Sequence, residues 1–421
     1  MKYLIFPALL FLQITLWGQD TLNLDWCIQQ AVEHAPQRAN REQIHRKGSL
    51  QQENIQTNWL LTLALNGQVT YQSDVVSLEM SDPSVPFSFP DMPHEQVALN
   101  LDVEQTLYDG GTITRKKTLD RIETETALQQ LKVDLYGIRE NITQLYFSVL
   151  LLQENRENAE IALDNLKQQE TLVQAALENG TAMESDLHII RVEIMEILQS
   201  LDELDARRNA LIQMIAIHTG KELKPETVCK VPYLEVEEDS ALVRPEMELF
   251  ELQSATLEAG KELVQARRRP RVFAFGQAGY GLPGYNMLND DWDTYYRIGA
   301  GVRWQILDWN QVKREQQIFD ARQQMVYNNR NSFEQQINAA MVKEREQIKH
   351  YRHAIEMDRK MLKMRREITR DAASRLENGV INATEYTVEL NREQRVRVKL
   401  TTHKIKLLQG IANYKTLQGT L

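Results

Sequence analysis

Two long stretches of this chain contain no proline, and they limit its possible folds more than any other feature. No proline lies between Pro93 and Pro225, and none follows Pro283. Proline breaks the interior of an α-helix, so its absence over such stretches permits very long helices. In the first stretch, apolar residues recur in steps of three and four, which is the seam of a coiled coil. The members of this seam are Leu128, Leu131, Leu135, Ile138, Ile142, Leu145, Val149 and Leu152. The pattern predicts a rod of nearly seventy residues, roughly 100 Å long.

The two stretches belong to an internal duplication. The tetrapeptide Leu177–Gly180 recurs as Leu376–Gly379, 199 positions later, and Asp109 corresponds to Asp308 at the same spacing. Upstream the spacing is 209, because the first copy carries a longer, proline-rich loop over Ser81–Pro93. Each copy therefore predicts helix, strand, loop, strand, long helix, break and long helix.

These patterns set the expected boundaries. The first repeat is expected over residues 19–220, with strands near 60–72 and 95–108 and long helices near 110–178 and 182–219. A linker is expected over residues 221–243. The second repeat is expected over 244–421, with strands near 271–281 and 294–307 and long helices near 310–377 and 382–418. In its seam Glu344 and Asp358 interrupt the apolar step.

The first eighteen residues are typical of a secretory signal peptide, with Lys2 before an apolar run over Leu4–Leu16 that is too short to span a bilayer. Secretion places Cys27 and Cys229 in an oxidising compartment, where they form either a disulfide or two buried thiols. The net charge of −10 opposes a nucleic-acid partner, whose phosphates require a basic surface.

Three of the four predicted strands alternate strictly between apolar and polar residues, as in Leu61–Tyr71 and Tyr296–Ile306. The third, over Val272–Tyr280, alternates less regularly and is rich in glycine. Each is roughly ten residues long, the length that a tilted strand needs to cross a bilayer. Aromatic residues gather at the strand ends, as in the girdles of membrane barrels. These aromatic residues are Trp59, Tyr71, Tyr108, Tyr280, Trp292, Tyr295, Trp304 and Trp309. Four strands cannot close a barrel, and open edges are not tolerated in lipid, so several chains must share one barrel. The sequence thus predicts an α+β membrane protein.

The residues at the ends of the long helices have capping chemistry. Asp109 and Asp308 stand where strand becomes helix, and their side chains can cap the first turn. Asn179-Gly180 and Asn378-Gly379 are helix stops, because both residue types tolerate the left-handed conformation.

With these elements in place, the chain resembles the TolC-type outer-membrane efflux proteins, also called outer membrane factors. The segments that carry the resemblance are Cys27–Val32 with Ala35-Pro36, Gln105–Gly111, Gln305–Trp309, Asn179–Leu187 and Asn378–Tyr386. The resemblance implies a homotrimer in the outer membrane of a Gram-negative bacterium. Its twelve-stranded barrel, four strands from each chain, would continue as an α-helical coiled-coil tunnel through the periplasm, with the 221–243 linker in the belt around the tunnel.

The resemblance also implies a passive exit duct for efflux or type I secretion. The tips would dock a periplasmic adaptor, which connects the tunnel to an inner-membrane pump, either an ABC transporter or a proton-driven one. The implied docking residues are Asn179, Gly180, Thr181, Asp186, Leu187, Asn378, Gly379, Val380, Glu385 and Tyr386. Asp186 and Glu385 would also form the aperture, where carboxylates favour cations. Their alternative role is to face the positive end of the return helix.

The chain departs from the family pattern at the tip. Leu376 and Ile381 stand where relatives use a tyrosine and an arginine to latch the tunnel shut, so the latch is expected to differ. The alternative to a duct is a secreted coiled-coil scaffold. We expect no catalysis, cofactor or metal: His350 and His353 lie one helical turn apart without acidic or thiol partners, which is typical of a solvated face.

Overall fold

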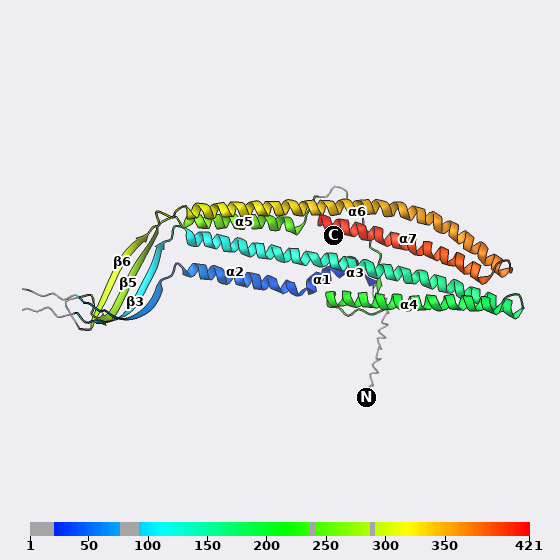
Figure 1. Cartoon of the computed structure of the whole chain (residues 1–421), viewed down its shortest axis with the longest axis horizontal. Helices are drawn as coiled ribbons and strands as arrows, with labels where there is room; N and C mark the ends of the chain where they lie inside the picture. Colours follow the sequence, from blue (N-terminus) through cyan, green and yellow to red (C-terminus); the bar gives the residue numbers. More distant parts are fainter. Residues whose placement is uncertain (1–20, 76–91, 236–240, 287–290) are drawn as a thin grey trace, which may run out of the picture. The chain divides into compact units, whose positions relative to one another are not determined.

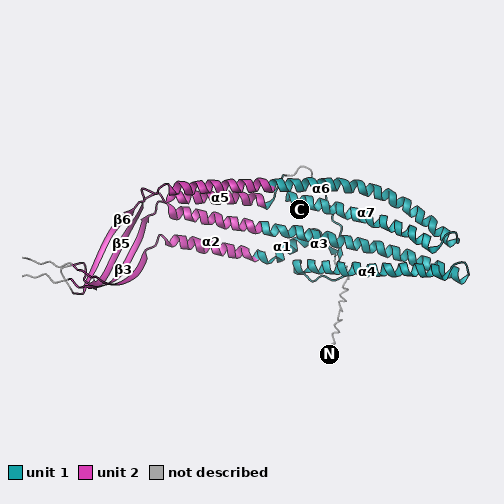
Figure 2. Ribbon diagram, viewed as in Figure 1, with its two compact units in different colours: residues 1–38, 133–245, 334–421 teal, residues 39–132, 246–333 magenta. Residues whose placement is uncertain are grey.

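The computed structural model of the chain describes residues 21–75, 92–235, 241–286 and 291–421 (Figure 1). These residues form two compact units, and each unit draws on both sequence repeats. Unit 1 lies within residues 1–38, 133–245 and 334–421, and unit 2 within residues 39–132 and 246–333 (Figure 2). The predicted signal peptide and nearly all of the Ser81–Pro93 loop lie outside the described residues.

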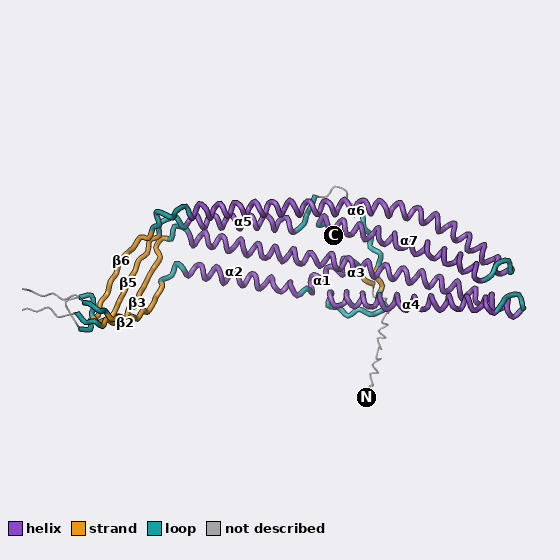
Figure 3. The backbone as a smooth tube through the Cα atoms, in the orientation of Figure 1, coloured by secondary structure: helices purple, strands orange, loops and turns teal. Residues whose placement is uncertain are grey.

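The long helices of the two repeats have equal lengths. The first in each repeat, α3 (Thr112–Glu178) and α6 (Gln311–Glu377), has 67 residues and contributes to both units. The return helices α4 (Glu184–Thr219) and α7 (Ala383–Gln418) have 36 residues each and lie in unit 1. Figure 3 shows these four helices as unbroken purple coils. The described residues contain no helix that is long and apolar enough to cross a membrane.

Unit 2 contains a four-stranded antiparallel sheet and the helices α2 (Asn40–Thr57) and α5 (Pro245–Ala266), of which α5 begins at the unit boundary. The strands are β2 (Thr62–Tyr71), β3 (Glu95–Tyr108), β5 (Arg271–Leu282) and β6 (Asp293–Arg303). They pair in the order β2-β3-β5-β6, so the first repeat supplies one half of the sheet and the second repeat the other.

The last strand is shorter than the sequence predicts. Alternation continues to Ile306 and the strand is expected to reach residue 307, but β6 ends at Arg303. Its partner strand β5 begins at Arg271, which lies opposite Arg303, so the residues that follow Arg303 have no strand to pair with. Instead, the indole Nε1 of Trp304 donates a hydrogen bond to the carbonyl oxygen of Arg268 at 2.9 Å.

One face of this sheet is apolar and open to solvent within the protomer. Leu65 is 69% exposed, Val69 76% and Ile298 81%. The strand register brings these residues to one face. Leu63 lies opposite Val103, Val103 opposite Gly276, and Gly276 opposite Ile298, and every second residue of a strand points to the same side. Without a further covering, the sheet therefore presents a large apolar surface, which in soluble monomers is rare.

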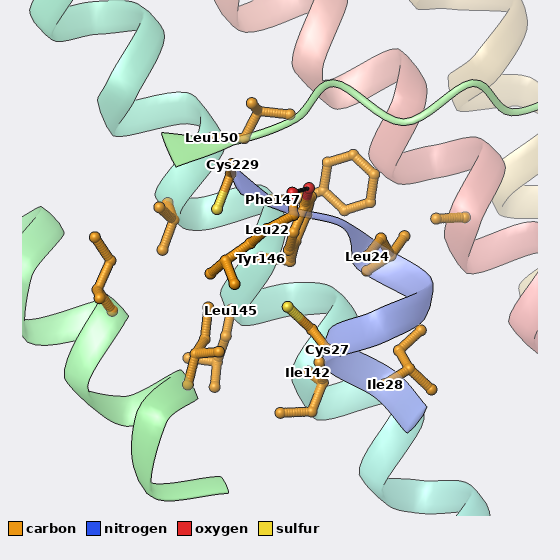
Figure 4. Packing of buried hydrophobic residues seen from close by; sticks show 14 of the residues in the cluster. Leu22, Leu24, Cys27, Ile28, Ile142, Leu145, Tyr146, Phe147, Leu150 and Cys229 are labelled. Carbon is orange, nitrogen blue, oxygen red and sulfur yellow. Dashed lines mark hydrogen bonds between the residues drawn. The ribbon is translucent and has the colours of Figure 1, made fainter. Parts of the chain in front are cut away.

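Unit 1 is organised around a core in which two short strands meet. β1 (Thr21–Leu22) pairs in parallel with β4 (Val228–Cys229), and α1 (Leu24–His34) follows β1 directly, before the 3-10 turn η1 (Pro36–Ala39). The hydroxyl of Tyr146, a fully buried residue of α3, lies 2.8 Å from the carbonyl oxygen of Leu22 and 2.6 Å from that of Lys230. The Tyr146 hydroxyl therefore links α3 to the segment of β1 and to the residue that follows β4 (Figure 4).

Cys27 and Cys229 are two free, buried thiols of this core (Figure 4). Burial raises the pKa of each from its ordinary value of 9.0 to about 12. The sequence left open a disulfide or two buried thiols, and in the structure the two cysteines are buried thiols.

Asp358, which interrupts the apolar seam of α6, has a polar partner on α7. Asp358 is only 1% exposed, and its Oδ2 lies 2.5 Å from Nδ1 of His403. The apolar cluster of Ile355, Leu362 and Leu400 surrounds this level of the hairpin. A buried carboxylate requires such a partner, because an unpaired one is very costly.

Candidate functional site

The first tip turn closes α3 with a Schellman motif. Gly180 has φ +71°, and its amide donates to the carbonyl of Leu177 at 2.9 Å. The amide of Thr181 donates to the carbonyl of Ala176, also at 2.9 Å. The side chain of Asn179 adds a bond from Nδ2 to the carbonyl of Ala175. These bonds satisfy the helix's last carbonyl groups, and glycine adopts this positive φ without the strain that a Cβ would add.

The second tip turn repeats this geometry at the end of α6. Gly379 has φ +68° and donates to the carbonyl of Leu376 at 3.0 Å, and Val380 donates to that of Arg375 at 2.8 Å. Nδ2 of Asn378 donates to the carbonyl of Ser374. The repeated tetrapeptide thus encodes two matching turns, both drawn at the same end of unit 1 (Figure 1).

Asp186 joins the two helical hairpins. Its Oδ2 accepts from the amide of Met183 at 3.1 Å, which caps its own helix α4. Its Oδ1 accepts from the amide of Ala383 at 3.3 Å, and Ala383 is the first residue of α7. A single half-buried carboxylate therefore faces the positive ends of two helices.

Glu385, the counterpart of Asp186 in the second repeat, makes only local contacts. Its Oε2 accepts from the amide of Asn382 at 3.4 Å, and its own amide donates to the Asn382 side chain at 2.9 Å. This is a complete capping box, with both acceptors inside one turn. Glu385 is exposed, so its charge faces solvent.

A groove of about 530 Å³ lies between the two turns. Its apolar walls include Val173 and Ile381, while Asp186 and Glu385 supply carboxylates. Gln169 also lines it; this side chain is 8% exposed and its Oε1 has no hydrogen-bond partner. The groove therefore offers an apolar surface with hydrogen-bond acceptors and negative charge.

Two of the predicted docking residues are buried in the core of unit 1. Leu187 is 4% exposed and Tyr386 3%, and both pack in the apolar cluster beneath the turns. Burial also raises the pKa of the Tyr386 hydroxyl to about 12. These two residues support the turns rather than face a partner, because each lies on the inward side of its return helix. Leu376 and Ile381, at the family's latch positions, pack against the same cluster.

The sheet has a polar face that the sequence reasoning did not single out. A hydrogen-bonded row crosses all four strands: Asp102 accepts from Asn66 at 2.6 Å and from Gln277 at 2.7 Å. Tyr285 donates to Gln277 at 2.6 Å, and Arg297 reaches the same oxygen at 3.3 Å. Alternation could have revealed most of this face, because its strand residues occupy the positions between apolar ones, whereas Tyr285 lies beyond the end of β5.

Comparison with solved structures identifies the architecture. The chain superposes on the outer membrane protein VceC of Vibrio cholerae with a TM-score of 0.67 at 14% identity, covering 94% of this chain and 96% of that one. For the outer membrane channel MtrE of Neisseria gonorrhoeae, in its open state, the TM-score is 0.69 at 15% identity, covering 94% and 89%. The outer membrane channel CmeC of Campylobacter jejuni gives 0.65 at 12% identity, covering 94% and 85%. The chain has the fold of these outer-membrane channels. No family model and no curated protein sequence matches it.

In this channel fold, the predicted caps connect the sheet to the long helices of each repeat. Asp109 accepts from the amides of Gly111, at 2.9 Å, and Ile113. Asp308 accepts from those of Asn310, at 3.1 Å, and Val312, at 3.3 Å. Both aspartates therefore serve as helix caps. Among the described residues of this channel fold, no three potential metal ligands gather.

Proposed function

We propose that this chain is one protomer of a TolC-type exit duct in the outer membrane of a Gram-negative bacterium. The observation that carries the proposal is the sheet of unit 2, which has a broad exposed apolar face and strands of 10 to 14 residues. These lengths suit tilted strands that cross a bilayer.

The sheet's two outer strands support a shared barrel. β2 and β6 each pair on one side only within the described residues. Lipid provides no hydrogen bonds to an open edge, so the edges must meet strands of other chains. Three copies would give twelve strands by closed cyclic symmetry, which is the simplest way to remove every edge.

The tip groove supports docking of a periplasmic adaptor. Val380 and Met183 are 68% and 72% exposed beside the groove, although apolar side chains are normally buried. An adaptor that presents apolar and basic side chains would match the apolar walls and the carboxylates. In the proposed assembly, the adaptor connects the duct to an inner-membrane pump, which supplies the energy for efflux or type I secretion. The accessible docking residues are Asn179, Gly180, Thr181, Asp186, Asn378, Gly379, Val380 and Glu385, with Leu187 and Tyr386 beneath them.

Glu385 is the proposed selectivity residue of the aperture, since its carboxylate is exposed and belongs to one turn only. Asp186 has a different proposed role. It holds the two hairpins together while the aperture is closed, because its oxygens accept from both return helices.

Planar-bilayer recording of the purified protein tests the duct. We expect discrete conductance steps, together with a heat-modifiable band in outer-membrane fractions. Absence from that fraction, with no conductance, would leave the secreted scaffold as the better account.

Pull-down by a co-expressed adaptor tests docking. Met183→Asp is expected to abolish capture, since it adds charge at the groove's apolar rim. Met195→Asp is the matched control, because Met195 is also on the surface of α4, at 65% exposure, but does not line the groove. Equal capture by both variants would place the docking surface elsewhere.

A further inference from the structure

Two arginines lie directly opposite each other near one end of the sheet. Arg271 of β5 and Arg303 of β6 are register partners, and both are exposed. Opposed residues of antiparallel strands point to the same face, and like charges in such a pair destabilise the sheet. Neither arginine forms an ion pair with any described residue, whereas nearby Arg267 pairs with Glu315 at 3.4 Å. This pair of cations therefore lacks a counter-charge.

The pair belongs to the polar face of the sheet. The guanidinium of Arg303 lies 5.3 Å from the centre of the Phe273 ring, and Phe273 is two residues along β5 from Arg271. Alternation puts Val302 and Ile298 on the other, apolar face, where both are highly exposed. The arginines therefore face away from the proposed lipid surface.

Two phenylalanine rings extend from this pair along the polar face. A Cβ on Gly301 would come within 2.5 Å of the Phe273 ring, and one on Gly299 within 2.7 Å of the Phe275 ring. The glycines thus leave space for the rings, whose centres are 6.2 Å apart. Both rings are half-buried; the Arg303 guanidinium lies over the Phe273 ring, and that of Arg297 lies 5.6 Å from the centre of the Phe275 ring.

No acidic residue on this face is close enough to neutralise the pair. Glu104 lies opposite Phe275, four residues along the strand from Arg271, which is about 13 Å at the usual rise. That exceeds the screening length of roughly 10 Å at ordinary salt. Asp102 lies still farther along and already accepts from Asn66 and Gln277. In the proposed trimer β6 would adjoin β2 of the next chain, and β2 contains no acidic residue.

We propose that Arg271 and Arg303, with the Phe273 and Phe275 rings, form a binding site for organic anions that combine a carboxylate with an aromatic ring. The two guanidinium groups hold the carboxylate, and the rings contact the aromatic body. The site rests on the proposed function in one respect: if the chain forms the duct, the polar face of the sheet lines it. The site would give the duct a positively charged binding position for such solutes.

Saturation-transfer NMR with benzoate on the detergent-solubilised full chain tests the site. Arg303→Gln is expected to raise the half-saturating benzoate concentration about fivefold, the upper range for an exposed ion pair. The Arg271→Gln/Arg303→Gln double variant is expected to abolish saturable binding. Arg267→Gln removes the same charge away from the pair and is expected to leave binding unchanged. Heat-modifiable migration, measured in parallel, shows that each variant is folded.

The outcomes separate the site from the duct. Equal benzoate binding by the wild type and the double variant would overturn the site, as would equal binding of benzylammonium, which has the opposite charge. Arginine-dependent benzoate binding by a protein that forms no conducting channel would uphold the site and refute the duct.

Discussion

Replacing Asp186 by asparagine is expected to favour the open state of the proposed aperture. Asparagine retains one acceptor oxygen for the two amides that Asp186 now serves, and its NH₂ group would face the other amide. The link to Ala383 is 3.3 Å long and half-exposed, so its loss costs about 0.5–1 kcal/mol per protomer. If three protomers open together, the total is roughly 1.5–3 kcal/mol, which corresponds to about a 10- to 150-fold higher ratio of open to closed states.

Single-channel recording measures this ratio as open probability at fixed voltage. Glu385→Gln is the matched control, because both of its contacts are with Asn382 in its own turn. That variant is expected to retain the wild-type open probability and to lose cation preference, since it removes one exposed carboxylate per protomer. An Asp186→Asn channel with wild-type open probability would refute the link between the hairpins. Unchanged selectivity of Glu385→Gln would remove Glu385 from the aperture.

Three further predictions concern stability, measured by thermal unfolding. Gly180→Ala is expected to lower the free energy of unfolding by about 1–2 kcal/mol, because φ is +71° and no atom lies near the added Cβ, so the cost is backbone strain alone. Gly137→Ala is expected to raise it by about 0.5–1 kcal/mol, because Gly137 lies in the middle of α3 with free space for a Cβ. Tyr146→Phe is expected to cost about 1–3 kcal/mol, since it removes a buried hydroxyl from two backbone carbonyls; an unchanged midpoint would show that these contacts contribute nothing. Burial holds the pKa of the Cys27 and Cys229 thiols at about 12, so above pH 9 the thiols ionise first in the unfolded chain and the stability of the protein falls as pH rises. This fall should be shallower in the variant with both cysteines replaced by alanine. An equal dependence on pH in the variant and the wild type would contradict the role of the thiols.

The local devices of the fold could be read from the sequence, because each depends on a few neighbouring residues. The repeated Asn-Gly pairs predicted the two helix ends, and both glycines have positive φ. Asp109 and Asp308 are caps as expected. Alternation indicated the sheet because its two faces contact different surroundings.

Contacts between distant segments could not be read in this way. The bond from Ala383 to Asp186 depends on how two hairpins pack, which no local pattern specifies. Asp358 looked like an interruption of the seam because its partner His403 lies 45 residues away. The end of β6 at Arg303 was missed because a strand ends where its partner ends, and alternation continues beyond that point.

The docking role of the tips stays a prediction, and the structure adds which of the named residues are accessible. The sequence placed ten residues at the tips, and the structure shows that Leu187 and Tyr386 are buried beneath them. The arginine pair on the sheet was missed for another reason. Arg271 and Arg303 are 32 positions apart, and only the strand register brings them together.

The central claim is that three chains share one barrel, and native mass spectrometry of the protein released from detergent micelles tests it most directly. Open strand edges on both sides of a four-stranded sheet predict a particle of three chains that stays intact after its release from the micelle. A folded single chain under the same conditions would contradict the account.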